Sequence, residues 1–434
     1  MVGYDVIVVG ARVAGAATAM LLARRGLRVL VVDRVSFPSD TISSHQVQVP
    51  GVARLHRWGL LGRLRAASTP PTRRVRFDSG DVVLDGRFPS LDGVDALYSP
   101  RRTVLDAVLV DAARASGAEV RERFRAVDLT WSDGRVTGIR GARPGGAPVT
   151  ETAPLVVGAD GKHSFVSGAV SAGRYRHRPA ASFACYTYWS GVPVTGGELY
   201  QRPGRAVAVF PTNDDLVMVY LAAPLAEFGA FRGDVEGHYL KTLDLCGDLG
   251  DRVRSAVRAE RLRTTPDQPN VFRTSHGPGW ALVGDAGVVM DSISAQGITN
   301  AFRDAELLAG AIVAGLGGTR PLRVALAAHQ RQRDRAIRPM YDFTTRLAEF
   351  TPRRVERLLL GSLAGRPAEV DRFLGAFAGV TPVGEYFTPA NVLRLIGARA
   401  ALRLAFSSGA DAVRSCVSTA GALPGKAHAH RGAR

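Results

Sequence analysis

Lysine and cysteine are both rare in this chain of 434 residues, which contains three of each. Cys185, Cys246 and Cys416 lie far apart and form no CxxC pair, so the sequence supports neither a zinc site nor a disulfide framework. We therefore expect reduced, partly buried thiols and no bound metal.

Long apolar runs are also missing. The longest charge-free apolar stretch, Leu307 to Thr319, is shorter than the roughly 18 to 20 residues that a bilayer span needs. The first residues show no basic region followed by a small-residue cleavage site. With 46% hydrophobic and 22% charged residues, an intrinsically disordered chain is excluded. We expect a globular cytoplasmic protein without an integral-membrane segment.

Positive charge is abundant, with a formal net charge of +17. The arginines are dispersed over most segments rather than gathered in one block interleaved with aromatic residues, so we expect no nucleic-acid partner. The positive charge fits an anionic small molecule equally well.

The chain opens with a strand-helix-strand pattern. Tyr4–Val9 is an apolar run typical of a parallel strand covered on both faces, Val13–Arg25 is rich in helix formers, and Arg28–Val32 predicts a second strand. A strand that turns directly into a helix presents backbone N–H groups and the positive end of the helix dipole, which together bind a pyrophosphate.

The turn between this strand and helix matches the dinucleotide fingerprint GxGxxG in its first and third glycines, Gly10 and Gly15, but Arg12 replaces the middle one. Arg12 must point away from the phosphates or lie over them as a counter-charge. Asp33, at the end of the second strand, would accept hydrogen bonds from a ribose. The predicted cofactor-binding residues of this unit are Gly10, Arg12, Val13, Ala14, Gly15, Asp33 and Arg34.

Further elements follow from periodicity and turn signals. Beyond Arg320 the chain is expected to be helical, and the tail from about Ala420 has no periodicity. The elements predicted before that point are a helix at Arg102–Ser116, a hairpin of Glu119–Leu129 with Arg135–Arg140, buried strands at Leu155–Gly158 and Trp280–Val283, an antiparallel sheet within Ser182–Leu221, and a helix at Gly297–Ala314.

Three segments identify the class of dinucleotide. They read Gly-Ala-Asp160-Gly161, Gly284-Asp285-Ala-Gly and Ala-Gln-Gly297-Ile-Thr-Asn. Over roughly residues 4–310 the chain resembles the single-component flavoprotein monooxygenases, in a superfamily with aromatic hydroxylases, geranylgeranyl reductases and flavin halogenases. The resemblance implies FAD and an α/β fold, with a Rossmann-type FAD-binding domain like that of para-hydroxybenzoate hydroxylase (the GR2 type), an antiparallel-sheet substrate domain and a C-terminal helical region.

The same resemblance implies domain boundaries. Residues 1–70, 98–178 and 272–320 would form the FAD-binding domain, and 71–97 with 179–271 the substrate-binding sheet domain. A C-terminal helical region would span 321–418, followed by a disordered tail, 419–434.

Residue roles also follow from the resemblance. Asp285 would contact the ribitol chain, and the N–H groups around Gly297, Ile298 and Thr299 would face the pyrimidine carbonyls, where a helix start stabilises the negative charge of reduced flavin. Arg102 would contact the cofactor; the alternative is a solvated charge at a helix start. Other cofactor residues implied are Ser44, Val127, Asp160 and Gly284.

The segment from Phe37 to Val47 resembles the loop that runs from the adenosine end of FAD to the isoalloxazine. His45 would then lie near the reacting ring, and it is the candidate catalytic residue, as a proton donor or substrate contact. The alternative is a histidine that holds this loop by hydrogen bonds.

The strand from Arg205 to Pro211 bears on the reaction. Halogenases resemble one another in a W-x-W-x-I-P segment at this place, and several prenyl reductases in a Y-x-W-x-F-P segment, where this chain has Ala206 and Ala208. Small residues here would leave volume for a substrate ring beside the flavin. The alternative is that both alanines are ordinary strand residues. The chain departs from the class at three positions: it has Ser167 where an arginine is usual, Ser292 where a proline is usual and Thr299 where an asparagine is usual. The predicted substrate-pocket residues are Gln46, Val47, Tyr186, Tyr188, Ala206, Ala208, Phe210, Pro211 and Tyr220.

The resemblance favours a monooxygenase in which NAD(P)H reduces FAD, O2 forms a flavin C4a-hydroperoxide, and an aromatic or polyketide-like molecule of bacterial secondary metabolism, such as antibiotic biosynthesis, is hydroxylated. A reductase of a prenyl or other alkene is the alternative, and a flavin-binding sensor or scaffold is a third. The reductant would be NAD(P)H bound transiently or a partner reductase, because no second strand-GxGxxG-helix unit is present in the sequence. The protein would be a monomer or homodimer.

Overall fold

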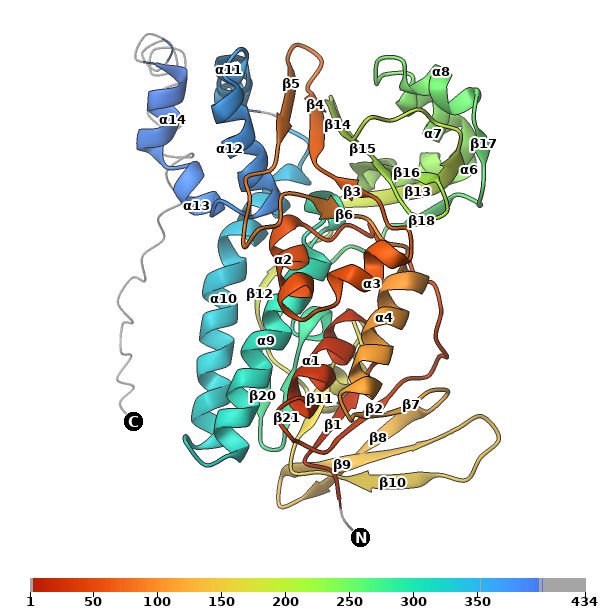
Figure 1. Cartoon of the computed structure of the whole chain (residues 1–434), viewed down its shortest axis with the longest axis vertical. Helices are drawn as coiled ribbons and strands as arrows, with labels where there is room; N and C mark the ends of the chain where they lie inside the picture. Colours follow the sequence, from red (N-terminus) through yellow and green to blue (C-terminus); the bar gives the residue numbers. More distant parts are fainter. Residues whose placement is uncertain (1–2, 352, 398–399, 401–434) are drawn as a thin grey trace, which may run out of the picture.

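The computed structural model describes residues 3–351, 353–397 and 400, whose elements lie in three tiers along the long axis (Figure 1). A six-stranded sheet and its helices form the middle tier, an eight-stranded sheet lies above it, and a three-stranded sheet lies below it. The expected tail, 419–434, lies outside the described residues.

The middle sheet consists of short apolar strands. The side chains of β1 and β2 are at most 7% exposed, as expected for strands covered on both faces. The strand order is β20-β21-β11-β1-β2-β7, and every pair is parallel except β20 with β21. The strands are β1 (Val6–Val9), β2 (Val29–Val32), β7 (Glu119–Arg121), β11 (Val156–Gly158), β20 (His276–Gly277) and β21 (Trp280–Leu282).

The predicted hairpin is confirmed in part. β8 (Arg125–Ser132) and β9 (Arg135–Ala142) are antiparallel, and β10 (Val149–Thr152) adds a third strand. The assignment of Glu119–Leu129 to one strand was wrong, because the chain turns at Arg123, whose φ of 54° is left-handed, and β7 before the turn pairs with β2 instead.

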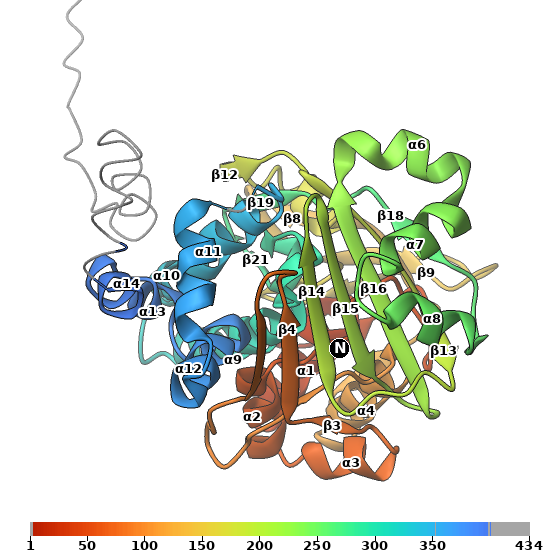
Figure 2. The ribbon, with the colours of Figure 1, turned by 90° about the horizontal axis from the view of Figure 1, so that it is seen from above.

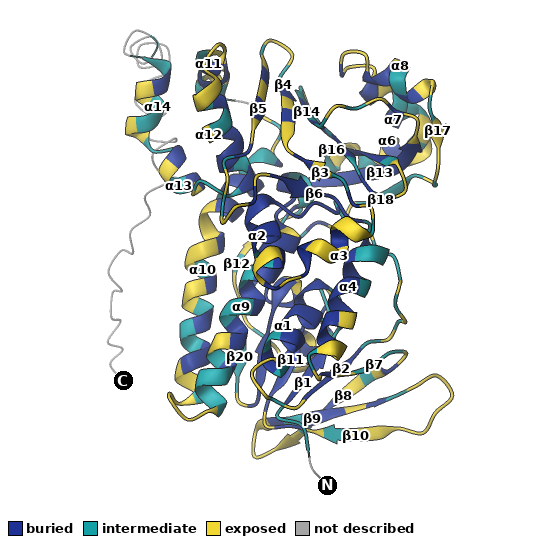
Figure 3. Cartoon of the chain, in the orientation of Figure 1, coloured by how far each residue is buried: buried dark blue, intermediate teal, exposed yellow. Residues whose placement is uncertain are grey.

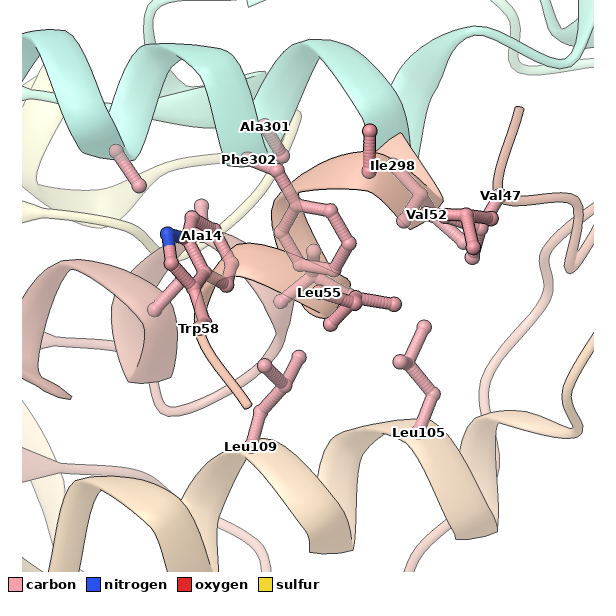
Figure 4. Packing of buried hydrophobic residues seen from close by; sticks show 14 of the residues in the cluster. Ala14, Val47, Val52, Leu55, Trp58, Leu105, Leu109, Ile298, Ala301 and Phe302 are labelled. Carbon is pink, nitrogen blue, oxygen red and sulfur yellow. The ribbon is translucent and has the colours of Figure 1, made fainter. Parts of the chain in front are cut away.

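Helices cover the middle sheet. Figure 4 shows Leu55, Leu109 and Phe302 pointing toward one another from three helices, and the rings of Trp58 and Phe302 meet edge to face with centroids 5.2 Å apart. The two longest helices of the described chain lie side by side (Figure 1). The helices of this tier are α1 (Val13–Ala23), α2 (Val49–Arg57), α3 (Leu61–Ala66), α4 (Arg102–Ala115), α5 (Phe165–Ala169), α9 (Gly297–Leu316) and α10 (Leu322–Leu347).

The upper sheet confirms the antiparallel sheet predicted within Ser182–Leu221 and extends it. Its order is β17-β13-β16-β15-β14-β4-β5, with β18 also paired to β13, and only the β14–β4 pair is parallel among its described strands. The strands are β4 (Arg74–Asp78), β5 (Val83–Arg87), β13 (Ser182–Ser190), β14 (Gly197–Arg202), β15 (Arg205–Pro211), β16 (Leu216–Pro224), β17 (Val257–Arg258) and β18 (Arg263–Thr265).

The two faces of this sheet have different neighbours. Val207 and Val209 of β15 pack in a cluster with the helices α6 (Phe228–Gly233), α7 (Val235–Leu243) and α8 (Leu249–Arg254), whereas Ala206 and Ala208 pack with Tyr220 on the other face. Figure 2 shows α6 to α8 along β13 to β16, and α11 and α12 on the side of β4.

The C-terminal region is helical, as predicted. Buried and exposed residues alternate along α10, α11 and α14 (Figure 3), and α12 packs on β5. No helix in the described part of the chain combines the length and the apolar character that crossing a membrane requires. The helices after α10 are α11 (Arg354–Leu363), α12 (Pro367–Ala378), α13 (Val383–Tyr386) and α14 (Pro389–Ile396).

Candidate cofactor and substrate site

A cavity of about 950 Å³ lies beyond the carboxyl ends of β1, β2 and β11, the usual place for a ligand in an open parallel sheet. Of the sequence-predicted cofactor residues, Gly15 and Thr299 lie outside its lining. The predicted residues that line it are Gly10, Arg12, Val13, Ala14, Asp33, Arg34, Ser44, Arg102, Val127, Asp160, Gly284, Asp285, Gly297 and Ile298.

The glycines of the first turn have distinct roles. Gly10 has a φ of 104°, and a Cβ there would lie 2.5 Å from the carbonyl oxygen of Ala159. A Cβ on Gly15 would lie 1.8 Å from the carbonyl oxygen of Gly10. Gly15 therefore allows α1 to start close to β1, while Gly10 faces the cavity.

The Arg12 side chain is held by other residues and also lies at the cavity wall. Its guanidinium donates to Asp106 at 2.6 Å and to the carbonyl oxygens of Ser39 and Asp40 at 3.3 and 3.1 Å, so it is tied to the loop that follows β2. It still lines the cavity. The buried Asp106 also accepts from Arg102 at 2.9 Å, so one carboxylate holds both arginines and leaves a net positive charge at the cavity wall.

Asp33 holds the turn as well as facing the cavity. Its carboxylate accepts from the backbone N–H groups of Ala11 at 2.7 Å and Val35 at 3.1 Å. A carboxylate has about four acceptor positions, so Asp33 keeps capacity for a ribose hydroxyl.

Asp160 and Asp285 are two further carboxylates that line the cavity. Burial raises the pKa of Asp160, whose carboxylate accepts from Ser164 and from the Val166 N–H at 3.1 Å. Asp285 is accessible from within the cavity although protein surrounds it, and this burial raises its pKa, opposed by the nearby charge of Arg102.

The start of α9 is fixed by contacts with neighbouring segments. Ala295, with a φ of 51°, turns the chain into the helix, and Gly297 is accessible from the cavity. Thr299 instead accepts from the Gln48 N–H at 3.0 Å. Further along α9, Asp304 accepts from the Gly284 N–H at 2.8 Å and pairs with His329 of α10 at 2.7 Å, which links three segments around the cavity.

His45, the predicted catalytic residue, lies outside the lining of both cavities described in this section. It is fully buried, its φ is 59°, and its Nε2 hydrogen-bonds the hydroxyl of Tyr188. Burial, followed by the charges of Arg102 and Arg101, lowers its pKa well below the ordinary value, so the imidazole is neutral. This geometry favours the loop-holding alternative.

A smaller, mainly apolar cavity of about 130 Å³ adjoins the first. Three predicted pocket residues, Val47, Tyr188 and Pro211, lie outside the lining of this smaller cavity. Val47 is buried and forms a backbone bridge with Tyr98, and the Tyr188 ring contacts His45 and Arg101. Tyr186 lines the large cavity instead. The predicted residues that line the smaller cavity are Gln46, Ala206, Ala208, Phe210 and Tyr220.

Much of the smaller cavity is lined by residues that were not among the sequence-predicted pocket residues. Phe77 and Phe88 come from β4 and the segment after β5, Phe350 follows α10, and Leu374 and Phe377 come from α12. Their apolar character gave no sign of a ligand, because such residues fill ordinary cores equally well.

The two cavities share part of their walls. Ser44, Tyr220, Ser292 and Ala295 line both. A ligand in the smaller cavity would therefore lie directly beside whatever occupies the adjoining end of the larger one.

The residues of the large cavity fit FAD. A glycine turn at a helix start and the Arg12–Asp106–Arg102 group suit a pyrophosphate, and Asp33 suits a ribose. The start of α9 suits a ring system with carbonyl oxygens that gains negative charge on reduction. Fold and site together define a flavin-dependent oxidoreductase.

Comparison with known proteins gives the family. Residues 3–344 match the model of the FAD binding domain family, and the chain belongs to that family. It is 30% identical over 392 residues to a kynurenine 3-monooxygenase of Salinispora arenicola, covering 81% of each chain. It is 28% identical over 339 residues to a digeranylgeranylglycerophospholipid reductase of Methanothrix thermoacetophila, covering 71% of this chain and 77% of the reductase.

Among solved structures, the myxobacterial chondrochloren halogenase CndH has a similar fold, with a TM-score of 0.74 over 91% of this chain and 95% of that one. At 22% identity this similarity supports the fold alone.

Proposed function

We propose that this protein is an FAD-dependent monooxygenase that uses NAD(P)H and O2 to hydroxylate an aromatic or polyketide-like small molecule in bacterial secondary metabolism. The observation that carries the proposal is the shared wall of the two cavities at Ser44, Tyr220, Ser292 and Ala295. A substrate ring in the smaller cavity would contact the reactive end of FAD across this border.

Bound FAD supplies the redox chemistry, because it accepts a hydride and its reduced form reacts with O2. The residues of this chain bind and orient it. Arg12 and Arg102, both held by Asp106, offset the charge of its phosphates, and the N–H groups at the start of α9 stabilise negative charge on its ring.

The smaller cavity positions the substrate and excludes water. Its walls carry Phe77, Phe210 and Phe377, and the small side chains of Ala206 and Ala208 leave room next to the border with the larger cavity. That room lets a substrate ring approach the flavin, which favours hydroxylation over halogenation.

NAD(P)H is the proposed reductant. In the described residues, one strand-turn-helix unit, β1 to β2, carries a dinucleotide fingerprint, so we expect the nicotinamide to bind transiently at the mouth of the same cavity. Arg34, Arg125 and Lys162 line this cavity and would attract its phosphates.

A reductase of a prenyl or other alkene is the second candidate. Its support is the similarity to the Methanothrix reductase together with the apolar walls of the smaller cavity.

The two candidates differ in what they add to a substrate. The holoenzyme should be incubated with NADPH and 18O2, first with a panel of phenols and aromatic polyketides and then with geranylgeraniol, and the products analysed by mass spectrometry. The proposal predicts a product that carries one atom of 18O. Addition of two hydrogens to the alkene, without incorporation of 18O into any substrate, would overturn it in favour of the reductase.

A further inference from the structure

A chain of buried polar groups ends at the border between the two cavities. Tyr220 and Ser292 are border residues, and the chain continues through Gln268, Ser182 and Asp291, each at most 5% exposed. Gln268 and Asp291 also line the large cavity, whereas Ser182 lines neither. The chain joins β16 and β13 to the segment before α9.

The contacts are continuous. The Tyr220 hydroxyl lies 2.8 Å from Ser292 Oγ, and Ser292 Oγ hydrogen-bonds Gln268 Oε1. The other end of the same amide, Gln268 Nε2, donates to Ser182 Oγ at 2.7 Å. Ser182 Oγ in turn donates to Asp291 Oδ2 at 2.6 Å.

Two groups determine which atom donates in each hydrogen bond of this chain: the backbone N–H of Ser292 at one end and the carboxylate of Asp291 at the other. The backbone N–H of Ser292 also donates to Gln268 Oε1, at 3.1 Å, so the oxygen of that amide must face Ser292 and its NH2 group must face Ser182. At pH 8, where Asp291 is ionised, its carboxylate accepts only, so Ser182 must donate to it. Ser292 has one hydroxyl hydrogen, and Gln268 Oε1 takes it.

Tyr220 must therefore donate its own hydrogen to Ser292, which leaves its oxygen as an acceptor. We propose that Tyr220 Oη accepts a hydrogen bond from the substrate, so that this protein selects a neutral aromatic ring that bears an O–H or N–H donor beside the flavin. The identity of the ligand as a substrate rests on the proposed function, whereas the binding experiment below does not depend on it.

The charges around the smaller cavity favour a neutral substrate ring over an anionic one. Arg202 and Arg205 are the charged residues among the described residues that line it. Arg202 is paired with Asp78 at 2.9 Å and Arg205 is paired with Glu227, so neither offers an uncompensated cation to a substrate carboxylate.

Binding of small probes to the oxidised holoenzyme tests the proposal. Dissociation constants should be measured by the change in FAD absorbance for 4-ethylphenol, 4-ethylaniline, 4-ethylanisole and 4-ethylbenzoate. The first two carry a donor, the anisole is matched in shape but lacks one, and the benzoate is an anion. We expect the wild type to bind the phenol and the aniline about five- to tenfold more tightly than the anisole, and the benzoate most weakly.

Variants test whether Tyr220 causes the preference for phenol over anisole. Tyr220→Phe should bind the phenol and the anisole equally, and Ser292→Ala should reduce the preference because Tyr220 can then turn its hydrogen toward the ligand. Tyr386→Phe is the matched control, since that hydroxyl is buried without a hydrogen-bond partner in the described residues and lines neither cavity. It should keep the full preference.

Equal binding of phenol and anisole by the wild type, an unchanged preference in Tyr220→Phe, or no binding of any probe would overturn the inference. Because the readout is equilibrium binding without NAD(P)H, a protein that fails to hydroxylate can still show the preference. Failure of the proposed function is therefore seen separately.

Discussion

At the residue scale, Arg12 replaces a glycine where a dinucleotide fold usually brings bare backbone close to phosphate. The structure accommodates it through Asp106, which binds the guanidinium of Arg12 and also that of Arg102. The side chain therefore leaves the turn and ties the loop at Ser39 and Asp40 to α4.

Arg12→Ala should weaken FAD binding about tenfold, because it removes a charged hydrogen-bond donor from the phosphate region and releases the loop at Ser39 and Asp40. Fluorescence titration of the apoprotein with FAD measures the change. Arg25→Ala, at an exposed position near the other end of α1, is the control and should bind FAD like the wild type. Equal affinity in both variants would contradict the role given to Arg12.

Asp291 makes stability depend on pH. Burial raises its pKa from 3.8 to about 6, although hydrogen bonds from Ser182 and the Ile293 N–H oppose the shift. A raised pKa in the folded state means that its neutral form is favoured, so its contribution to stability is full below about pH 4 and falls as pH rises through 6.

Asp291→Asn should therefore raise the free energy of unfolding by roughly 2 to 3 kcal/mol at pH 8 and leave it nearly unchanged at pH 4. Urea unfolding of the holoprotein at the two pH values measures this. The exposed Asp81→Asn is the control and should show no such difference. A gain that is the same at both pH values would show that ionisation is not the cause.

The sequence allowed prediction of cavity residues that stand where a strand ends. Gly10, Asp33 and Gly284 stand at the ends of recognisable strands, and all of them line the large cavity. His45 was less predictable, because it follows a loop whose path depends on contacts with Tyr188, which lies 143 positions away in the chain.

At the element scale, the smaller cavity depends on how α12 sits against β5. Gly86 lies at the contact, where a Cβ would come within 2.8 Å of side-chain atoms of Val370, Asp371 and Leu374. Leu374 and Phe377 on the same helix line the cavity. The position of α12 therefore sets the shape of the smaller cavity.

Gly86→Ala should push α12 away from β5, lower the melting temperature and weaken 4-ethylphenol binding a few-fold while the FAD content stays unchanged. Gly62→Ala provides the control, because a Cβ there meets no atom within 4 Å, so it should be neutral or stabilising. Thermal unfolding and the absorbance titration measure both effects. Loss of FAD together with substrate binding would instead indicate general damage.

Periodicity predicted the helices α1, α4 and α9 and the helical character of the region after Arg320, but not which distant elements meet. The helical character of Pro367–Ala378 is local, whereas its packing on β5 joins segments far apart in the sequence. The division of the predicted Glu119–Leu129 strand has the same origin, since the partner of β7 is β2.

At the scale of the whole molecule, the large cavity lies between the middle and upper tiers, because its lining includes both Gly10 of the first turn and Tyr220 of the upper sheet. A ligand there connects the two sheets, so its binding energy adds to the stability of the folded chain.

Adding FAD to the apoprotein should therefore raise its melting temperature by several degrees at about 100 times the dissociation constant, equivalent to about 2.7 kcal/mol. Riboflavin, which lacks the pyrophosphate and adenosine, should have a much smaller effect at the same concentration. An equal effect of the two ligands would contradict binding at the first turn and Asp33.

Monooxygenase activity is tested by anaerobic reduction of the purified holoenzyme with NADPH or NADH, followed by rapid mixing with O2 while the flavin spectrum is recorded. A monooxygenase predicts an absorbing species distinct from both reduced and oxidised FAD before the oxidised spectrum returns. Direct return from reduced to oxidised FAD, with no such species, would contradict a monooxygenase and favour a reductase.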